Sequence, residues 1–225
     1  MRPLLLSLCL WLSSCLLLED SSTGAPQAPA PAVPEAQEEP QPPLWEPFAG
    51  YARMYSLPPD EEILMPVRGV RVRQVADTFG APRSGGRQHE GQDIFAPRGT
   101  PVYSATEGVV VRMGYGQLGG NYVYVLGPGG RRYYYAHLHA YAKGLEEGDE
   151  VTTSTVLGYV GNTGNARTTP PHLHFGVYGS WWSGDERVIN PLVLLRDRDW
   201  KTLGKAGGAK PATRPSSAPA ARPAR

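Results

Sequence analysis

Apolar and polar residues alternate in short runs through the middle of the chain, between residues 63 and 196. The runs are rich in Val, Tyr and Thr and are separated by Gly, Pro, Asn or Asp, which is typical of β-strands joined by turns. No segment of this region shows the 3.6-residue period of a long helix. The pattern predicts strands at residues 70–79, 100–104, 108–113, 121–126, 131–137, 156–160 and 172–178.

A glycine-rich connection sets the direction of two of these strands. Gly127-Pro128-Gly129-Gly130 lies between two β-type runs and predicts a hairpin, so the neighbouring strands are expected to be antiparallel. Tyr133, Tyr134 and Tyr135 fall in the second run and are expected to pack within the strand. The fold class predicted for residues 61–198 is therefore all-β, built on an antiparallel sheet.

The first residues have the pattern of an export signal. Met1-Arg2 gives a positive start, and the apolar run that follows is shorter than the roughly 20 residues of a membrane-spanning helix. Leu12-Ser13-Ser14-Cys15 resembles the lipobox of bacterial lipoproteins, which implies a signal peptide at residues 1–14 and a lipid on Cys15. The alternative is an ordinary cleaved signal in which Cys15 stays unmodified. Anchoring would place the chain in the cell envelope; Leu16, rather than aspartate, favours an outer membrane, facing the periplasm, if the cell has two membranes.

Two segments of biased composition flank the predicted domain. Residues 15–60 are rich in Pro, Ala and acidic residues, and this composition predicts a disordered tether. Residues 199–225 carry Lys and Arg among Ala, Pro and Gly and predict a basic disordered tail. Aromatic residues between residues 44 and 66 leave open whether the end of the tether packs over the domain.

Charge and cysteine content narrow the chemistry. The formal net charge is +1, and the predicted domain has no basic stripe with interleaved aromatics, so we expect no nucleic-acid binding. The two cysteines, Cys9 and Cys15, both lie at the N-terminus, so the domain can hold neither a disulfide framework nor a cysteine zinc site. Any metal must be bound by histidine and carboxylate.

The histidines all fall inside the predicted domain, at His89, His137, His139, His172 and His174. Residues two apart in a strand share a face, so His172 and His174 are expected to project together, about 6.6 Å apart along the chain. Asp93 follows His89 by four residues in glycine-interrupted, loop-like sequence and adds an oxygen ligand. Three protein ligands leave zinc an open position for water, as in catalytic sites.

His89-Glu90-Gly91-Gln92-Asp93 could be mistaken for the helical His-Glu-x-x-His motif of metalloproteases with its last ligand changed. That motif requires a helix. Neighbouring glycines and Pro97 argue against one, so Glu90 is not assigned as a general base.

Three blocks of sequence resemble the LytM/lysostaphin-type zinc metallopeptidases, which cut peptide cross-links of bacterial peptidoglycan. The blocks are Phe79-Gly80-Ala81-Pro82-Arg83 through His89 and Asp93 to Gly99-Thr100-Pro101-Val102, then Tyr135-Ala136-His137-Leu138, and finally Gly161-Asn162-Thr163-Gly164 with Pro171-His172-Leu173-His174-Phe175. The resemblance implies a LytM-like sheet of the barrel-sandwich hybrid type with a substrate groove. It also implies one Zn²⁺ per chain, bound by His89, Asp93 and His174.

The same resemblance makes His137 and His172 the catalytic pair and peptidoglycan stem peptides the substrate of a chain expected to be monomeric. His139 occupies a place usually held by Ser or Asn, and it is expected to be incidental. It would share a face with His137 if the strand continues unbroken.

Residues beside the blocks bear on specificity. Arg83 and Arg87 stand where enzymes that cut pentaglycine commonly carry a tyrosine, and arginine can bind a stem-peptide carboxylate. We therefore expect cleavage between D-Ala and diaminopimelate, with Asn121 and Thr163 as further candidate substrate ligands. The alternative function is a regulator that has lost catalysis, binds the cell wall and activates amidases; such regulators typically lack some of the five residues that this chain retains.

Overall fold

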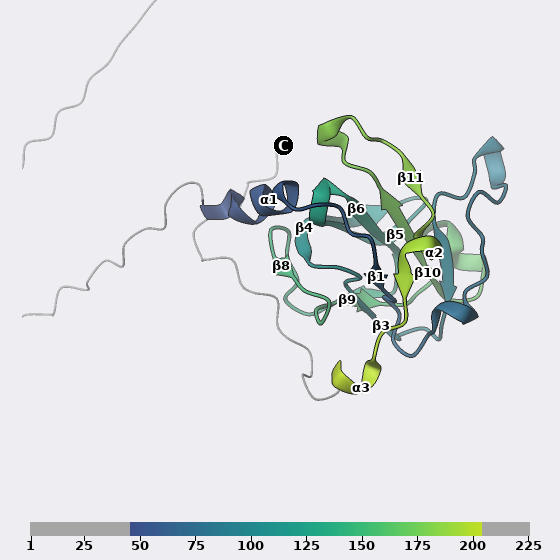
Figure 1. The fold of residues 1–225 in the computed structure, drawn as a ribbon. Helices are drawn as coiled ribbons and strands as arrows, with labels where there is room; N and C mark the ends of the chain where they lie inside the picture. Colours follow the sequence, from purple (N-terminus) through teal and green to yellow (C-terminus); the bar gives the residue numbers. More distant parts are fainter. Residues whose placement is uncertain (1–45, 204–225) are drawn as a thin grey trace, which may run out of the picture. The chain divides into compact units, whose positions relative to one another are not determined.

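The computed structural model describes residues 46–203, drawn in colour in Figure 1. The strands are β1 (Ile63–Leu64), β2 (Gln92–Phe95), β3 (Pro101–Tyr103), β4 (Gly108–Gly116), β5 (Gly120–Leu126), β6 (Arg132–Leu138), β7 (Ala140–Tyr141), β8 (Glu150–Val151), β9 (Val156–Tyr159), β10 (His172–Tyr178), β11 (Val188–Ile189) and β12 (Leu195–Arg196). The α-helices are α1 (Glu46–Ser56), α2 (Pro191–Leu194) and α3 (Trp200–Leu203). The 3-10 turns are η1 (Val72–Gln74), η2 (Ser84–Gly86), η3 (Pro128–Gly130), η4 (Gly164–Thr168) and η5 (Trp181–Ser183).

One large antiparallel sheet organises the domain. Its strands follow the order β11-β10-β6-β5-β4-β8, and β2 pairs with β10 as well. A smaller antiparallel sheet has the order β3-β9-β7, and the short strands β1 and β12 pair in parallel. The predicted all-β antiparallel class is confirmed. The signal peptide, Cys15, most of the tether and nearly all of the tail lie outside the described residues, and their assignments stay predictions.

The predicted hairpin is confirmed: β5 and β6 pair antiparallel, and η3 connects them. The strand predicted at residues 172–178 coincides with β10, and the other predicted runs from residue 100 onward each overlap an observed strand.

The strand predicted at residues 70–79 is wrong, because this segment forms η1 and irregular backbone. Val70, Val72 and Val75 do pack against the core, which accounts for the apolar pattern. The backbone N–H of Val72, however, donates to the Asp197 side chain at 2.7 Å, and the η1 turn uses further donors locally. The valines of this segment are therefore packed against the core although the segment does not pair with a strand.

Alternation along the central strands separates the core from the opposite face. Val123 and Val125 of β5, Tyr133 and Tyr135 of β6, and Leu173, Phe175 and Val177 of β10 are fully buried. The residues between them, including Tyr134 and His174, project to the other side of the sheet, where the groove described below lies.

Helix α1 lies within the residues predicted as tether, so residues 46–56 belong with the domain. It packs beside β4 (Figure 1), and Met54 is fully buried against Val109 and Leu126. Arg53 forms an ion pair with Glu107 at 3.0 Å. In the described part of α1, no residue lines the groove. The helices within residues 46–203 are all too short or too polar to cross a bilayer.

Candidate metal centre and catalytic groove

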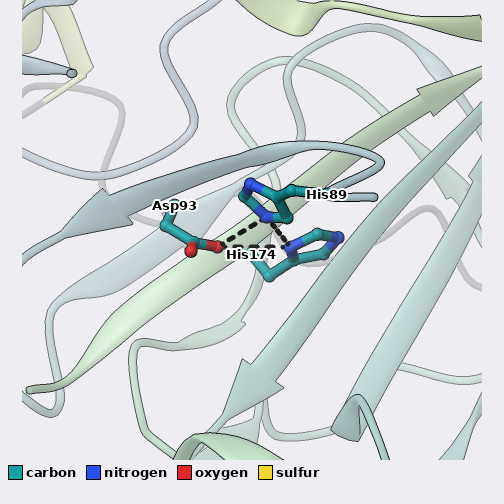
Figure 2. Close-up of side chains that lie close together, drawn as sticks. All are labelled: His89, Asp93 and His174. Carbon is teal, nitrogen blue, oxygen red and sulfur yellow. Dashed lines mark hydrogen bonds and ion pairs between the residues drawn. The ribbon is translucent and has the colours of Figure 1, made fainter. Parts of the chain in front are cut away.

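Three side chains from separate segments converge at one edge of β10 (Figure 2). His89 precedes β2, Asp93 lies on β2, and His174 lies on β10. The Nε2 atom of His89 is 2.9 Å from Nδ1 of His174 and 3.0 Å from Oδ1 of Asp93, and the third side of the triangle measures 3.2 Å. The three residues form the one group within residues 46–203 whose ligand atoms could together hold a metal ion.

The triangle matches the geometry of a zinc site. Zinc lies about 2.0–2.1 Å from nitrogen and oxygen ligands, so donors at neighbouring tetrahedral corners are about 3.3 Å apart. The observed separations of 2.9 to 3.2 Å are close to this value. Two imidazoles and one carboxylate are also a donor set that zinc accepts, and three protein ligands are typical of catalytic zinc sites.

Asp93 is held by the sheet rather than by a loop, which corrects the loop-like backbone expected there. β2 pairs with β10 so that Asp93 lies directly opposite His174. Gly91 makes the approach possible, because a Cβ atom at that position would lie 2.6 Å from the Phe175 carbonyl and 2.8 Å from the His174 ring. As expected, no helix carries His89 and Asp93.

The two oxygens of Asp93 have different partners. Oδ1 faces the histidines, while Oδ2 accepts a hydrogen bond from Arg83 at 2.6 Å. Burial acts to raise the pKa of the Asp93 carboxyl, but the adjacent His174 and His89 rings outweigh it and hold the pKa far below its usual value. The carboxylate is therefore ionised at any pH at which the domain would work.

A buried amide network orients the first two ligands. The His89 Nδ1–H donates to the Thr78 carbonyl at 2.7 Å, and the Asp93 N–H donates to Thr78 Oγ1 at 3.2 Å. Thr78 is fixed in turn by Gln92, a fully buried side chain whose Oε1 accepts from the Thr78 N–H at 2.9 Å. The Gln92 Nε2 donates to Asp77 and to Asn190, at 2.6 and 2.9 Å.

A bulge in β6 aims His137 into the groove. Three steps along β6, from Tyr135 to Leu138, face two steps along β5, from Val123 to Asn121. His137 lies within this extra length and has a φ of 61°, a positive value that it alone shows among the non-glycine residues described. Strict alternation would point His137 into the core with Tyr135, and the bulge reverses its direction.

His137 and His172 present the same ring nitrogen to the groove. The His137 Nδ1–H donates to the Thr163 carbonyl at 2.9 Å, and the His172 Nδ1–H donates to the Pro170 carbonyl at 2.8 Å. Because a carbonyl oxygen can only accept, Nε2 of each neutral ring carries a free lone pair. The ring centroids lie 5.0 Å apart, and that of His137 is 5.9 Å from that of His174.

Electrostatics favours the neutral form of His137. Burial, assisted by the positive charge that His172 and His174 can carry, lowers its pKa to about 4. Burial likewise lowers the pKa of His174. Near pH 7 both rings are therefore neutral, His137 as a proton acceptor and His174 as a metal ligand.

All five predicted metal and catalytic residues line one groove with a volume of about 840 Å³. Arg83 and Arg87 also line it. Asn121 and Thr163 do not: the Asn121 amide donates to the Leu138 carbonyl at 3.0 Å, and Thr163 Oγ1 accepts the Asn121 N–H at 2.9 Å. Both side chains donate to the carbonyl of Leu138, the residue after His137 on β6, and a role in substrate binding stays a prediction.

His139 lies apart from the groove, because the bulge breaks the alternation that would place it beside His137. Its side chain is exposed and contacts Arg98 at 3.5 Å. Strand β6 ends at Leu138, so the unbroken strand on which a shared face depended is not present, and an incidental role for His139 stays a prediction.

Comparison with known proteins places this arrangement in a family. Residues 87–191 match the model described as Peptidase family M23. The chain is 30% identical to the catalytic domain of lysostaphin from Staphylococcus simulans, over 52% of this chain and 90% of that domain, with a TM-score of 0.45. Residues 87–191 form a peptidase family M23 domain.

Two curated relatives are longer than this chain. The L-Ala--D-Glu endopeptidase of Bacillus subtilis is 42% identical over 108 residues, which cover 45% of this chain and 33% of the relative. The peptidoglycan DD-endopeptidase ShyC of Vibrio cholerae is 38% identical over 89 residues, which cover 40% of this chain and 20% of the relative. The chain thus spans a third or less of either relative.

The M23 groove contains aromatic residues that the sequence pattern did not single out. Tyr134 lines it, with its ring centroid 5.9 Å from that of His174, although it was expected to pack in the strand like Tyr133 and Tyr135. Phe95, with 55% of its surface exposed, packs against His172 at 5.2 Å. The signal that could have revealed Tyr134 is its alternation with two buried tyrosines, which places it on the face of His174.

Arg83→Ala in this M23 domain is expected to weaken zinc binding by about 10- to 100-fold, because outer partners orient metal ligands. The substitution releases Asp93 Oδ2 from its 2.6 Å hydrogen bond. Competition titration with a chromophoric chelator measures the affinity. Arg87→Ala is the matched control, since its guanidinium contacts the Ser84 carbonyl instead; equal losses in both variants would contradict this role.

Proposed function

We propose that this chain is a zinc-dependent endopeptidase that hydrolyses peptide cross-links of bacterial peptidoglycan. One observation carries the proposal: three metal-ligand atoms within 3.2 Å of one another lie in the same groove as two histidines with free Nε2 lone pairs. Membership of family M23 supports peptide hydrolysis, and the names of both curated relatives are those of endopeptidases.

Zinc held by His89, Asp93 and His174 would supply Lewis acidity, which lowers the pKa of water to about 7 and polarises a carbonyl. The proton chemistry falls to His137 and His172. A ring whose Nδ1–H is already engaged must take up a proton at Nε2 before it can donate there. One ring accepts the proton of the attacking water and returns it to the leaving amine nitrogen. The other takes a proton from bulk solvent, donates a hydrogen bond to the oxyanion and keeps that proton.

For specificity we propose the bond between D-Ala and diaminopimelate. ShyC is named a DD-endopeptidase, whereas the Bacillus subtilis relative is named for the L-Ala–D-Glu bond, so similarity alone supports both bonds. Arg83 and Arg87 favour a substrate with a free carboxylate beside the groove. Arg83 already engages Asp93, which leaves Arg87 as the more available of the two.

A cell-wall-binding regulator that activates amidases is the second candidate function. The retained ligand triangle and histidine pair favour the enzyme, because a protein that only binds needs neither a metal triangle nor two proton acceptors.

The decisive experiment is digestion of purified cross-linked muropeptides by the full chain. We expect release of monomers by the zinc-loaded protein, loss of activity after dialysis against a chelator, and recovery when about one equivalent of Zn²⁺ is added. Chromatography and mass spectrometry identify the bond that is cut. Stimulation of an amidase without any release of monomers would support the regulator instead.

We also propose that the enzyme works in the cell envelope, held by a lipid on Cys15. The lipobox-like sequence before Cys15 supports this location. Mass spectrometry of the mature N-terminus tests it, and an unmodified Cys15 would argue against the anchor.

A further inference from the structure

Four tyrosines continue the groove along the outer face of the large sheet. We call Tyr122, Tyr124, Tyr134 and Tyr178 the tyrosine platform; each is half-buried. Tyr134 pairs with Tyr124 on β5 and with Gly176 on β10, so all of these positions share one face. His174 lies two residues before Gly176, on the same face. Tyr134 and Tyr178 also line the groove, so the platform is continuous with the metal centre.

The platform rings contact one another closely. Tyr124 and Tyr134 are stacked, with centroids 4.4 Å apart and planes at 25°. Tyr122 lies 5.7 Å from both of these rings. The contacts fix the side chains in advance, so little rotamer freedom remains to be lost when a ligand binds.

Two glycines allow tyrosine rings to lie against the sheet. A Cβ atom at Gly176 would lie 2.9 Å from the Tyr178 ring, and one at Gly114 would lie 3.1 Å from the Tyr122 hydroxyl. Tyr122 and Tyr178 can therefore approach the sheet closely, and the platform forms an aromatic surface beside the groove.

Polar groups border the platform. The Arg132 guanidinium lies over the Tyr178 ring at 5.6 Å from its centroid, and Arg112 pairs with Tyr124 at the exposed side. The Tyr178 hydroxyl donates to the Glu90 carbonyl at 3.4 Å, at the junction with the groove. The platform therefore combines aromatic rings with phenol and guanidinium hydrogen-bond donors. This combination matches a ligand that is apolar on the faces of its own rings and carries hydroxyl and amide groups around their edges.

We propose that the tyrosine platform binds the glycan strand of peptidoglycan through the C–H faces of its N-acetylated sugars. The inference rests on the proposed function: stem peptides are covalently attached to the strand, so a cross-link held in the groove brings sugars alongside it. Continuity with the groove favours this occupant. The half-buried tyrosines and bordering arginines suit a hydrated carbohydrate better than the apolar core of a protein interface.

The first measurement is binding of the wild-type chain to peptide-free glycan strands, prepared by removing stem peptides with an amidase. Binding is expected, and its absence overturns the proposal. The test does not depend on hydrolysis, because these strands contain no peptide bond to cut. Failure to release monomers from cross-linked muropeptides would instead count against the endopeptidase and leave glycan binding measurable.

The second measurement compares two substrates in the Tyr122→Ala/Tyr124→Ala double variant, since neither residue lines the groove. We expect kcat/KM on intact sacculi to fall by about tenfold, which corresponds to the loss of ring contacts. Cleavage of cross-linked peptide dimers without sugars should stay within about twofold of wild type. Trp182→Ala, an aromatic 77% exposed outside the platform, is the control and should change neither rate.

Should the double variant fail to fold by circular dichroism, Tyr124→Leu replaces it, because it keeps an apolar contact with Tyr134 and removes the flat ring. Equal losses on both substrates would overturn the proposal and make the platform part of the peptide site. If the double variant differs from the wild type in oligomeric state, the proposal is also overturned, because the platform would then be a contact between copies of the chain.

Discussion

Asp93→Asn is expected to abolish zinc binding and peptide hydrolysis while leaving the fold intact. Asparagine has the shape of aspartate and can still accept the hydrogen bond from Arg83, so the substitution removes mainly the negative charge. That charge is the only one among the three ligands, since both histidines bind metal as neutral rings. Because loss of an outer partner alone weakens metal sites by about 10- to 100-fold, loss of the ligand charge should exceed that range.

The measurements are metal content after dialysis and monomer release from muropeptides. Asp185→Asn is the matched control, because Asp185 pairs with Arg187 two residues along the chain and does not line the groove. It should retain one zinc per chain and full activity. Wild-type zinc affinity in Asp93→Asn would remove Asp93 from the ligand set.

Local pattern was sufficient to predict the longer strands, β4, β5, β6 and β10. β10 was predictable because Leu173, Phe175 and Val177 alternate with His172, His174 and Gly176, and the same alternation puts both histidines on one face. The three sequence blocks named the residues that converge. The structure adds their distances, which no spacing along the chain determines.

Long-range contacts explain what was missed. Gln92 depends on Asn190, 98 residues away, and Val72 depends on Asp197, 125 residues away. Neither partner can be inferred from a local window. Helix α1 was left in the tether for a related reason: its burial comes from Val109 and Leu126, on strands far along the chain.

The bulge at His137 is the least predictable feature of the site. A sequence shows the order of Tyr135, His137 and His139 but not the extra residue that the strand accommodates between its neighbours. Simple alternation would therefore place the side chains of His137 and His139 on the same side of the strand, whereas the positive φ of His137 turns its side chain away. The two histidines consequently provide a matched comparison within a few residues of the same chain.

His137→Asn is expected to lower kcat by about 10²- to 10⁴-fold, the usual contribution of a positioned general acid or base. Asparagine is preferred to alanine because it tolerates the positive φ better, which limits the loss of stability. Zinc content should not change, because His137 lies outside the ligand triangle. His139→Asn, at an exposed side chain, should retain activity within about twofold. Rates measured on cross-linked peptide dimers, together with metal analysis of both variants, separate the roles; near-normal turnover by His137→Asn would transfer the proton chemistry to His172 alone.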